Sequence, residues 1–224
     1  MNFPLRLACV LLGLLLWSGA FAAERKASAD WTAEMGNFAQ ADAAAPSAEG
    51  CVLFVGSSSI RLWTTLKEDF PGVPVVNRGF GGSQVTDAIV HFERLVLPHR
   101  PRLIVFYAGT NDIAAGKEPA EVAADFAEFC ARVHAERPQS RIVFVSVQYA
   151  PARWHLKAKM VAANELIAKF CAEDPRREFV DVNVVTLGAT GEPRDEIYSP
   201  DRLHMSAAGY ALWTQALAKP INAR

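Results

Sequence analysis

The sequence predicts an α/β protein, a three-layer α/β/α sandwich around a five-stranded parallel sheet. Five short runs are apolar throughout, at residues 52–55, 73–76, 103–107, 142–147 and 179–182. Strands that are apolar throughout, rather than alternating with polar residues, are typical of strands buried on both faces of a sheet. Segments of helical length separate these runs, and strands that alternate with helices build a parallel sheet covered on both faces. A chain of 224 residues has the right length for one such domain.

Helical periodicity marks several of the intervening segments. Apolar residues recur every three or four positions from Val122 to Val133, and Pro119 lies where a first helical turn accepts proline. A second apolar stripe runs through residues 160–170, and Ser206 is placed to cap a last helix. Trp31, Met35 and Phe38 also have helical spacing, which predicts an earlier helix ahead of an alanine-rich linker.

The composition excludes several classes of protein. Hydrophobic residues make up 51% of the chain and charged residues 21%, which is enough apolar content for a packed core and excludes intrinsic disorder. The formal net charge is −1, so the chain lacks the basic excess that typifies nucleic-acid binding. We therefore expect no nucleic-acid partner.

The first residues have the pattern of a secretory signal peptide. Arg6 precedes an unbroken apolar run at residues 7–17, and Ala20-Phe21-Ala22 forms a small-residue cleavage site. The run is shorter than the ~20 residues that span a bilayer, so we expect cleavage after Ala22 and no transmembrane span in the mature chain. The predicted organisation is a signal peptide at 1–22, a helix and linker at 23–49, and one domain at 50–224. The predicted location is the periplasm or the exterior.

Three cysteines remain after that cleavage, Cys51, Cys130 and Cys171. An odd number cannot pair completely within one chain, and each lies among apolar residues. We expect buried thiols rather than a disulfide framework.

Four polar loops are placed to meet at one edge of the predicted sheet. Residues 56–59, 77–83 and 108–112 each follow an apolar run, and residues 201–204 stand just before the last helix. Ligands of open parallel sheets bind at the carboxyl ends of the strands. We therefore expect the functional site among these loops.

No cofactor or metal is predicted from these loops. The Gly79-Phe80-Gly81 block resembles the start of a dinucleotide-binding loop, but Gln84 stands where the third glycine belongs. Gly116-Lys117 is followed by Glu118 instead of the serine or threonine that a phosphate-binding loop needs. The spacing of Asp201 and His204 suits two metal ligands, but no cluster supplies the rest.

Taken together, the loops supply the groups that acyl transfer requires: a nucleophile, a base, a carboxylate that orients the base, and donors for an oxyanion. Ser58 offers the hydroxyl, His204 the base and Asp201 the carboxylate. Gly82 offers an unobstructed backbone N–H and Asn111 a side-chain amide.

These blocks resemble those of the SGNH-hydrolase superfamily, the GDSL-type esterases and lipases, over roughly residues 51–218. The blocks are Phe-Val-Gly-Ser-Ser-Ser-Ile, Asn-Arg-Gly-Phe-Gly-Gly-Ser, Gly-Thr-Asn-Asp and Asp-Arg-Leu-His. The resemblance implies a flavodoxin-like sheet of order 2-1-3-4-5, with Ser58 as nucleophile, His204 as base and Asp201 as its partner. It also implies an oxyanion hole formed by Ser58, Gly82 and Asn111.

The nucleophile block departs from the Gly-Asp-Ser-Leu pattern of the family. Ser57 replaces the aspartate, and Ser59-Ile60 replaces the leucine. The aspartate is not a catalytic group, so activity is still expected. Ser57 and Ser59 remain alternative nucleophiles on the motif alone, although alignment with the glycine favours Ser58.

The predicted function is that of an exported serine esterase acting through an acyl-enzyme on small or carbohydrate-linked acyl groups or on lysolipids. The same triad would serve an acyltransferase to envelope glycans, and an inactive relative that binds glycans or lipids is a third alternative. Arg78 is a candidate for pairing with an anionic substrate, with a structural ion pair as the alternative. Tyr149 and Trp154 are candidates for a pocket wall, with plain packing as the alternative.

Overall fold

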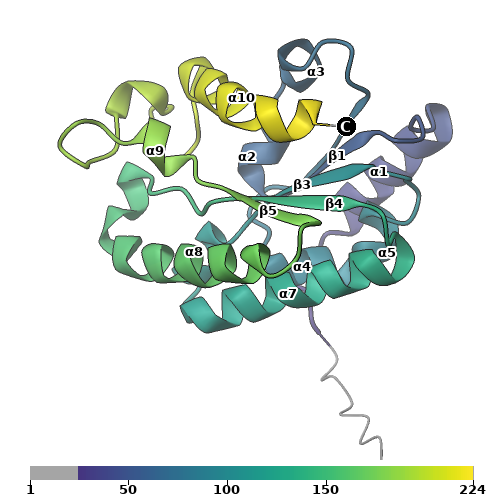
Figure 1. Cartoon of the computed structure of the whole chain (residues 1–224), viewed down its shortest axis with the longest axis horizontal. Coiled ribbons are helices and arrows are strands. Elements are labelled where there is room, and N and C mark those ends of the chain that lie inside the picture. The colour runs from purple at the N-terminus through teal and green to yellow at the C-terminus, as the bar shows by residue number, and fades with distance from the viewer. Residues whose placement is uncertain (1–24, 224) are drawn as a thin grey trace, which may run out of the picture.

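The computed structural model describes residues 25–223. Five parallel strands form one sheet in the order β2-β1-β3-β4-β5, as the fold prediction requires (Figure 1). Their bounds are β1 (Val52–Gly56), β2 (Val75–Gly79), β3 (Leu103–Tyr107), β4 (Arg141–Val145) and β5 (Arg177–Val180). The three-layer prediction and the predicted strand order are both confirmed.

Helices cover both faces of the sheet (Figure 1). One face carries α4 (Val85–Val90), α5 (Phe92–Leu95), α7 (Pro119–Glu136) and α8 (Lys157–Ala172). The other carries α2 (Ser58–Arg61), α3 (Leu66–Asp69) and α10 (Ala207–Asn222). The other described helices are α1 (Thr32–Ala44), α6 (Thr110–Ala114), η1 (Pro151–Leu156), α9 (Asn183–Thr186) and η2 (Asp195–Ile197).

Two hydrophobic clusters fill the spaces between these layers. Alternate residues of each central strand point to opposite clusters: Leu53 and Val55 pack toward α7 and α8, while Val52 and Phe54 pack toward α2 and α10. This two-sided burial is why the strands are apolar throughout instead of alternating.

The two edge strands depart most from the predicted limits. The runs at 73–76 and 179–182 predict strands that the structure places at Val75–Gly79 and Arg177–Val180. An edge strand is only partly covered, so its backbone ladder accepts polar residues such as Asn77 and Glu178. Apolar content is therefore a weaker guide to the ends of β2 and β5 than to those of β1 and β3.

The segment before the first strand packs into the domain. Ser28 donates two hydrogen bonds to the buried Asp87 of α4, one from its backbone N–H and one from its hydroxyl. Each has a donor–acceptor distance of 2.6 Å. Trp31 and Met35 of the predicted early helix, observed as α1, join the larger hydrophobic cluster. The predicted signal peptide at residues 1–22 lies outside the described residues.

The three thiols of the described chain, Cys51, Cys130 and Cys171, are free and buried, and burial raises the pKa of each. None of the helices within residues 25–223 combines the length and the apolar character needed to cross a membrane.

Candidate active site

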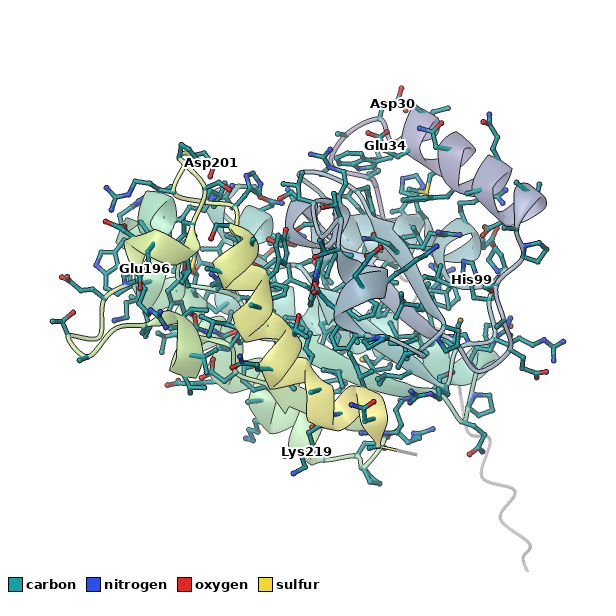
Figure 2. The ribbon with its side chains drawn as sticks, turned by 90° about the horizontal axis from the view of Figure 1, so that it is seen from above. Asp30, Glu34, His99, Glu196, Asp201 and Lys219 are labelled. Atoms are coloured by element: carbon teal, nitrogen blue, oxygen red, sulfur yellow. The ribbon has the colours of Figure 1, made fainter. Side chains whose placement is uncertain are left out.

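The four polar loops meet at the carboxyl end of the sheet, where β1, β2 and β3 lead into the segments carrying Ser58, Gly82 and Asn111. His204 and Asp201 arrive from the loop before α10. Figure 2 shows Asp201 at the same end of the molecule as Glu34 of α1, with Lys219 of α10 toward the other end. Segments from both ends of the chain thus frame one site.

Ser58, His204 and Asp201 form a continuous hydrogen-bonded chain. His204 Nε2 lies 2.8 Å from Ser58 Oγ, and His204 Nδ1 lies 2.6 Å from Asp201 Oδ2. A carboxylate only accepts hydrogen bonds, so Nδ1 carries the proton and Nε2 is left to accept from the Ser58 hydroxyl. This is the arrangement that activates a serine for nucleophilic attack.

The hydrogen bond from the His204 ring lowers the pKa of Asp201 to about 2, and the backbone N–H groups of His204 and Leu203 add to the effect. The aspartate is therefore ionised at neutral pH and holds the imidazole in one tautomer and one orientation.

The loop that carries the base is a short hairpin. Tyr198 and Met205 pair as an isolated antiparallel bridge, and the Ser199 N–H donates to His204 O over 2.7 Å. Asp201 Oδ1 accepts from the N–H groups of Leu203 at 2.9 Å and His204 at 3.0 Å. The Asp201 side chain thus both stabilises the turn and orients the base. This explains why Asp201 and His204 stand three positions apart in the sequence.

The structure distinguishes the three consecutive serines. Ser58 is the one whose hydroxyl contacts His204, and it is partly exposed. Ser57 and Ser59 are buried, at 3% and 7% exposure. The Ser59 carbonyl accepts the Tyr210 hydroxyl of α10 over 2.9 Å, which ties the turn to the last helix.

Three N–H groups are available for an oxyanion near Ser58. Within the described chain, the backbone N–H groups of Ser58 and Gly82 donate to no protein acceptor. Gly82 has φ +86°, a left-handed conformation that glycine adopts without steric cost. Asn111 Nδ2 donates one hydrogen to Ser83 O over 3.0 Å, which leaves its second hydrogen free. These are the residues that the sequence predicts for an oxyanion hole.

Positioning roles for Asn77 and Asp112 were not predicted from the sequence, although both residues lie inside the blocks that carry the family resemblance. Asn77 accepts the Gly79 N–H at 2.8 Å and donates to Ile60 O at 2.7 Å, so it fastens β2 to the turn that carries Ser58. The buried Asp112 accepts the Val85 N–H at 3.1 Å, which joins the Asn111 loop to α4. The available signal was their place in the polar segments 77–83 and 108–112, which the sequence analysis assigns to the functional edge of the sheet.

None of the three predicted substrate-binding side chains is brought to the site. Arg78 is buried, pairs with Asp42 of α1 and lies 5.0 Å from the Phe38 ring centre. Tyr149 is buried and its hydroxyl accepts from Asn164 Nδ2 at 3.1 Å. Both side chains thus make structural contacts within the domain, which is the alternative that the sequence analysis leaves open for each.

Trp154 lines a different hollow, with Pro151, Pro193 and Asp195 among its neighbours. Its ring faces Lys157 Nζ at 4.2 Å rather than Ser58. In this structure Trp154 therefore does not line the cavities at Ser58.

Two cavities meet at the triad, and both are lined by Ser58, Asn111, Arg153, Leu203 and His204. The smaller is enclosed by Tyr107, Thr110 and Ala150 and holds about 10 Å³, room for about one water molecule. The larger holds about 430 Å³ and adds Glu34, Arg61, Gly81 and Gly82 to its walls. Three charged side chains that sequence reasoning did not single out, Glu34, Arg61 and Arg153, thus face the reaction centre.

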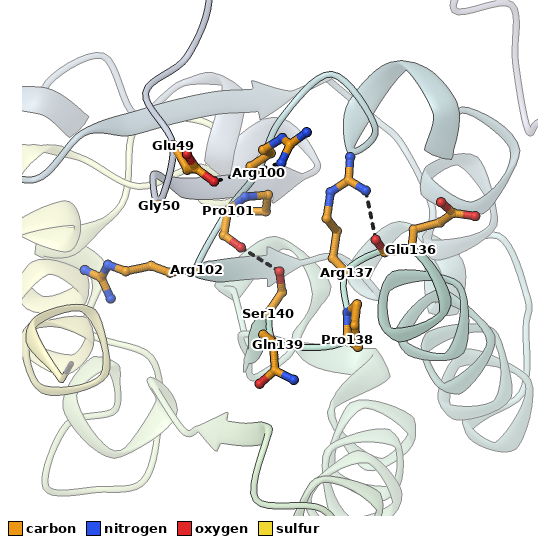
Figure 3. Close-up of a pocket in the computed structure, with 10 residues that line it drawn as sticks. All are labelled: Glu49, Gly50, Arg100, Pro101, Arg102, Glu136, Arg137, Pro138, Gln139 and Ser140. Carbon is orange, nitrogen blue, oxygen red and sulfur yellow. Dashed lines mark hydrogen bonds and ion pairs between the residues drawn. The ribbon is translucent and has the colours of Figure 1, made fainter.

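Another hollow, of about 520 Å³, lies at the amino ends of the strands (Figure 3). Arg102 and Ser140 in its wall directly precede β3 and β4, and the Ser140 hydroxyl donates to Pro101 O over 2.5 Å. It is separated from the triad by the length of the sheet. Within residues 25–223 no group of three or more potential metal ligands gathers.

Comparisons with known proteins agree with this geometry. The model of the GDSL-like lipase/acylhydrolase family matches residues 23–212. Among curated proteins, none matches the chain in sequence.

Several solved structures share the fold. A chain from Streptococcus pneumonia has a TM-score of 0.76 at 21% identity, covering 84% of this chain and 91% of that one. A GDSL-like lipase from Bacteroides thetaiotaomicron has a TM-score of 0.70 at 22% identity, covering 84% and 96%. A mutant of the acetylxylan esterase Axe2 from Geobacillus stearothermophilus has a TM-score of 0.65 at 17% identity, covering 80% and 96%.

Proposed function

Because the chain belongs to the GDSL-like lipase/acylhydrolase family and is a carboxylic ester hydrolase, we propose that it removes short acyl groups, acetyl above all, through a Ser58 acyl-enzyme. The observation that carries this proposal is the unbroken chain from Ser58 through His204 to Asp201. An inactive binding protein has no physical need for that alignment.

The reaction proceeds in two halves. His204 Nε2 takes the Ser58 proton as Oγ attacks the ester carbonyl, and the oxyanion rests on the N–H groups of Ser58, Gly82 and Asn111. The C–O bond to the alcohol then breaks, and His204 gives its proton to the leaving oxygen. In the second half His204 takes a proton from water, the resulting nucleophile attacks the acyl-enzyme, and the carboxylic acid leaves as Ser58 recovers its proton.

The preference for short acyl groups follows from the two cavities. An ester at Ser58 must place its acyl part in one cavity and its alcohol in the other. The smaller cavity, closed by the buried Tyr107 and Ala150, has room for a methyl group and not for a fatty chain. The larger one, lined mainly by polar and charged groups, suits the alcohol.

Covalent labelling tests the nucleophile. A fluorophosphonate is expected to add one label to the peptide containing Ser58, and the Ser58→Ala variant is expected to take up none while keeping the same thermal midpoint. Ser57→Ala and Ser59→Ala serve as matched controls that retain labelling. A folded protein that is unlabelled at Ser58 would refute the proposed chemistry.

A chain-length series tests the acyl preference. We expect kcat/KM for p-nitrophenyl acetate to exceed that for the octanoate by about 100-fold or more, because a long chain must displace the packed cavity wall. Equal values for the two esters would contradict the assignment of the small cavity to the acyl group.

We also propose that the enzyme acts outside the cytoplasm. The support is the pattern of residues 1–22, with its apolar run and small-residue cleavage site.

A further inference from the structure

We propose that the alcohol part of the substrate carries a negatively charged group close to the ester, and that Arg153, aided by Arg61, binds this group in the larger cavity. The inference rests on the proposed function and names its substrate class: acyl esters of singly charged anionic alcohols, such as a hydroxy acid or a phosphodiester. Both charged groups present oxygen acceptors that a guanidinium recognises.

Arg153 is half-buried and carries no partner for its charge within the described chain. Its Nη1 is shielded from solvent and donates no hydrogen bond, and no carboxylate of residues 25–223 pairs with it. Burial lowers its pKa, because the surroundings withdraw solvent from the cation without replacing it with an anion. A guanidinium nitrogen shielded from solvent normally has a partner, so an unpaired one in a cavity wall indicates a missing anion.

Other arginines of the described chain that are not fully exposed have partners for their guanidinium groups. Their guanidinium groups donate to carboxylates or to backbone carbonyls, as at Arg78, Arg102, Arg132, Arg137 and Arg141. Arg177 makes no such bond but stacks on the Phe170 ring, at 3.6 Å from its centre. Within the described chain, the guanidinium of Arg153 has neither an ion pair nor a stacked aromatic ring, although it lies in the wall of the active site.

The backbone holds Arg153 in place beside the triad. It lies in η1, after β4, and its N–H donates to Ala150 O over 2.9 Å. The adjacent Ala152 N–H donates to Arg202 O over 3.0 Å, which fastens η1 to the hairpin carrying Asp201 and His204. The backbone of Arg153 is thus fixed relative to the base, which keeps the guanidinium within reach of the larger cavity.

Arg61 supplies a second positive charge from the same turn as the nucleophile. It ends α2, three residues after Ser58, and its side chain passes closely over Gly81. A Cβ at Gly81 would lie 2.8 Å from Arg61 Nε, so this glycine gives the guanidinium its path along the cavity wall. Among the described residues, Arg61 has no ion pair within 4 Å.

Glu34 of α1 is the one carboxylate in the wall of the larger cavity, and it makes no ion pair with either arginine. The lining of the larger cavity therefore holds two positively charged side chains and one negatively charged side chain. A negatively charged substrate group would give the shielded Arg153 the partner that it lacks and would also be attracted by the exposed Arg61, whereas a cationic group would be repelled by both.

A matched pair of acetate esters tests the inference. The probes are 4-acetoxybenzoate and 4-acetoxybenzamide, which share shape and differ in charge, with 4-acetoxyphenyl methyl phosphate as the phosphodiester. The carboxamide is the more electron-withdrawing substituent, so leaving-group chemistry alone favours the neutral ester. We expect kcat/KM for at least one anionic ester to exceed that for the amide by about tenfold at low ionic strength.

Variants then assign the preference to the two arginines. Arg153→Gln and Arg61→Gln are each expected to lower the ratio of anionic to neutral kcat/KM by about three- to tenfold, mainly through KM. Arg153→Lys should retain part of the ratio, because it keeps the charge. Arg100→Gln is the matched control, since Arg100 lies in the distant hollow at the amino ends of the strands and its loss should leave the ratio unchanged.

The outcomes separate this inference from the proposed function. A neutral ester that is hydrolysed as fast as both anionic ones, with Ser58-dependent turnover intact, overturns the anion site and leaves the esterase standing. An anionic preference that persists in both the Arg153→Gln and the Arg61→Gln variants also overturns the anion site. Binding by the Ser58→Ala variant, measured by calorimetry, gives a readout without turnover: tighter binding of an anionic ester supports the site, and equal binding of all three overturns it.

Discussion

The proposed oxyanion hole gives the two hydrogens of the Asn111 amide two different tasks. One binds the Ser83 carbonyl at 3.0 Å and fixes the side chain, and the other remains for the oxyanion. Because the first contact supplies the orientation before substrate arrives, the second needs no reorganisation during the reaction.

We therefore expect Asn111→Ala to lower kcat for p-nitrophenyl acetate by about 10²–10³-fold, with KM changed far less, since the lost donor acts on the transition state. Steady-state kinetics and a thermal melt on the same preparation provide the check. A fall of less than threefold would remove Asn111 from the oxyanion hole.

The lowered pKa of Asp201 leads to a prediction about how kcat/KM changes at low pH. Its pKa is about 2, below the ordinary value near 3.9, because the His204 ring and two backbone N–H groups donate to it. A depressed carboxylate pKa means that the ionised form persists as pH falls toward 2, and that its orienting effect is lost only below that.

Asp201 should thus add no step to the pH dependence of kcat/KM between pH 6 and pH 4, because it stays ionised across this range. Initial rates measured between pH 6 and pH 4 test this prediction. Activity that recovers on return to pH 7 shows that the enzyme has not unfolded. An additional step with its midpoint near pH 4 would show that Asp201 titrates like an unpaired aspartate.

At the scale of elements, the central strands were predictable because burial on both faces leaves a continuous apolar run, as at residues 103–107. The catalytic groups were predictable because parallel strands deliver their following loops to one edge. Arg153 and Glu34 were not, since their place at the cavity depends on how η1 and α1 pack, and nothing local in sequence marks that. The ion pair of Arg78 depends on the same packing, because its partner is Asp42 of α1.

Helix α1 links the start of the described chain to the oxyanion loop. Trp31, just before its first turn, is buried edge-on against Phe80 with ring centres 5.2 Å apart. Its ring lies 3.7 Å from the position of a Cβ at Gly82. The helix therefore supports the loop that carries Gly82, whose N–H is a proposed oxyanion donor, and it also places Glu34 in the cavity wall.

Trp31→Ala should lower the free energy of unfolding by about 3–5 kcal/mol through the cavity it leaves. It should also lower kcat, because the Gly82 loop loses its support. Urea unfolding and p-nitrophenyl acetate kinetics measure the two effects. Gln40→Ala, an exposed change on the same helix, is the matched control. An unchanged unfolding midpoint in the Trp31 variant would show that α1 is not part of the cooperative unit.

For the whole molecule, stability rests on the two clusters flanking the sheet and not on covalent cross-links in the described chain. Cys51, Cys130 and Cys171 are free and buried, and burial raises the pKa of Cys171 to about 12. Thiols react as thiolates, and a raised pKa keeps these protonated over the physiological range.

We expect a thiol reagent to label none of these three cysteines in the native protein and all three in urea, as read by peptide mass spectrometry. The thermal midpoint should be the same with and without reductant. Rapid labelling of any of the three under native conditions would contradict their burial.

The start of the described chain bears on the maturation of the whole molecule. Arg25 reaches Glu128 with Nη2 at 2.7 Å, and Ser28 binds Asp87, so the chain is fastened to the domain from three residues beyond the predicted cleavage site at Ala22. Cleavage there would leave a short end followed by an anchored segment.

Expression of residues 1–224 in a Gram-negative host should yield a periplasmic protein whose first residue is Ala23, as determined by intact mass and N-terminal peptide. Ala22→Arg should block processing, because the cleavage site requires a small residue, and should leave a longer membrane-associated precursor. Ala33→Arg, at an exposed position in α1, is the control and should mature normally. Recovery of the wild-type chain from the cytoplasm with Met1 in place would overturn the export proposal.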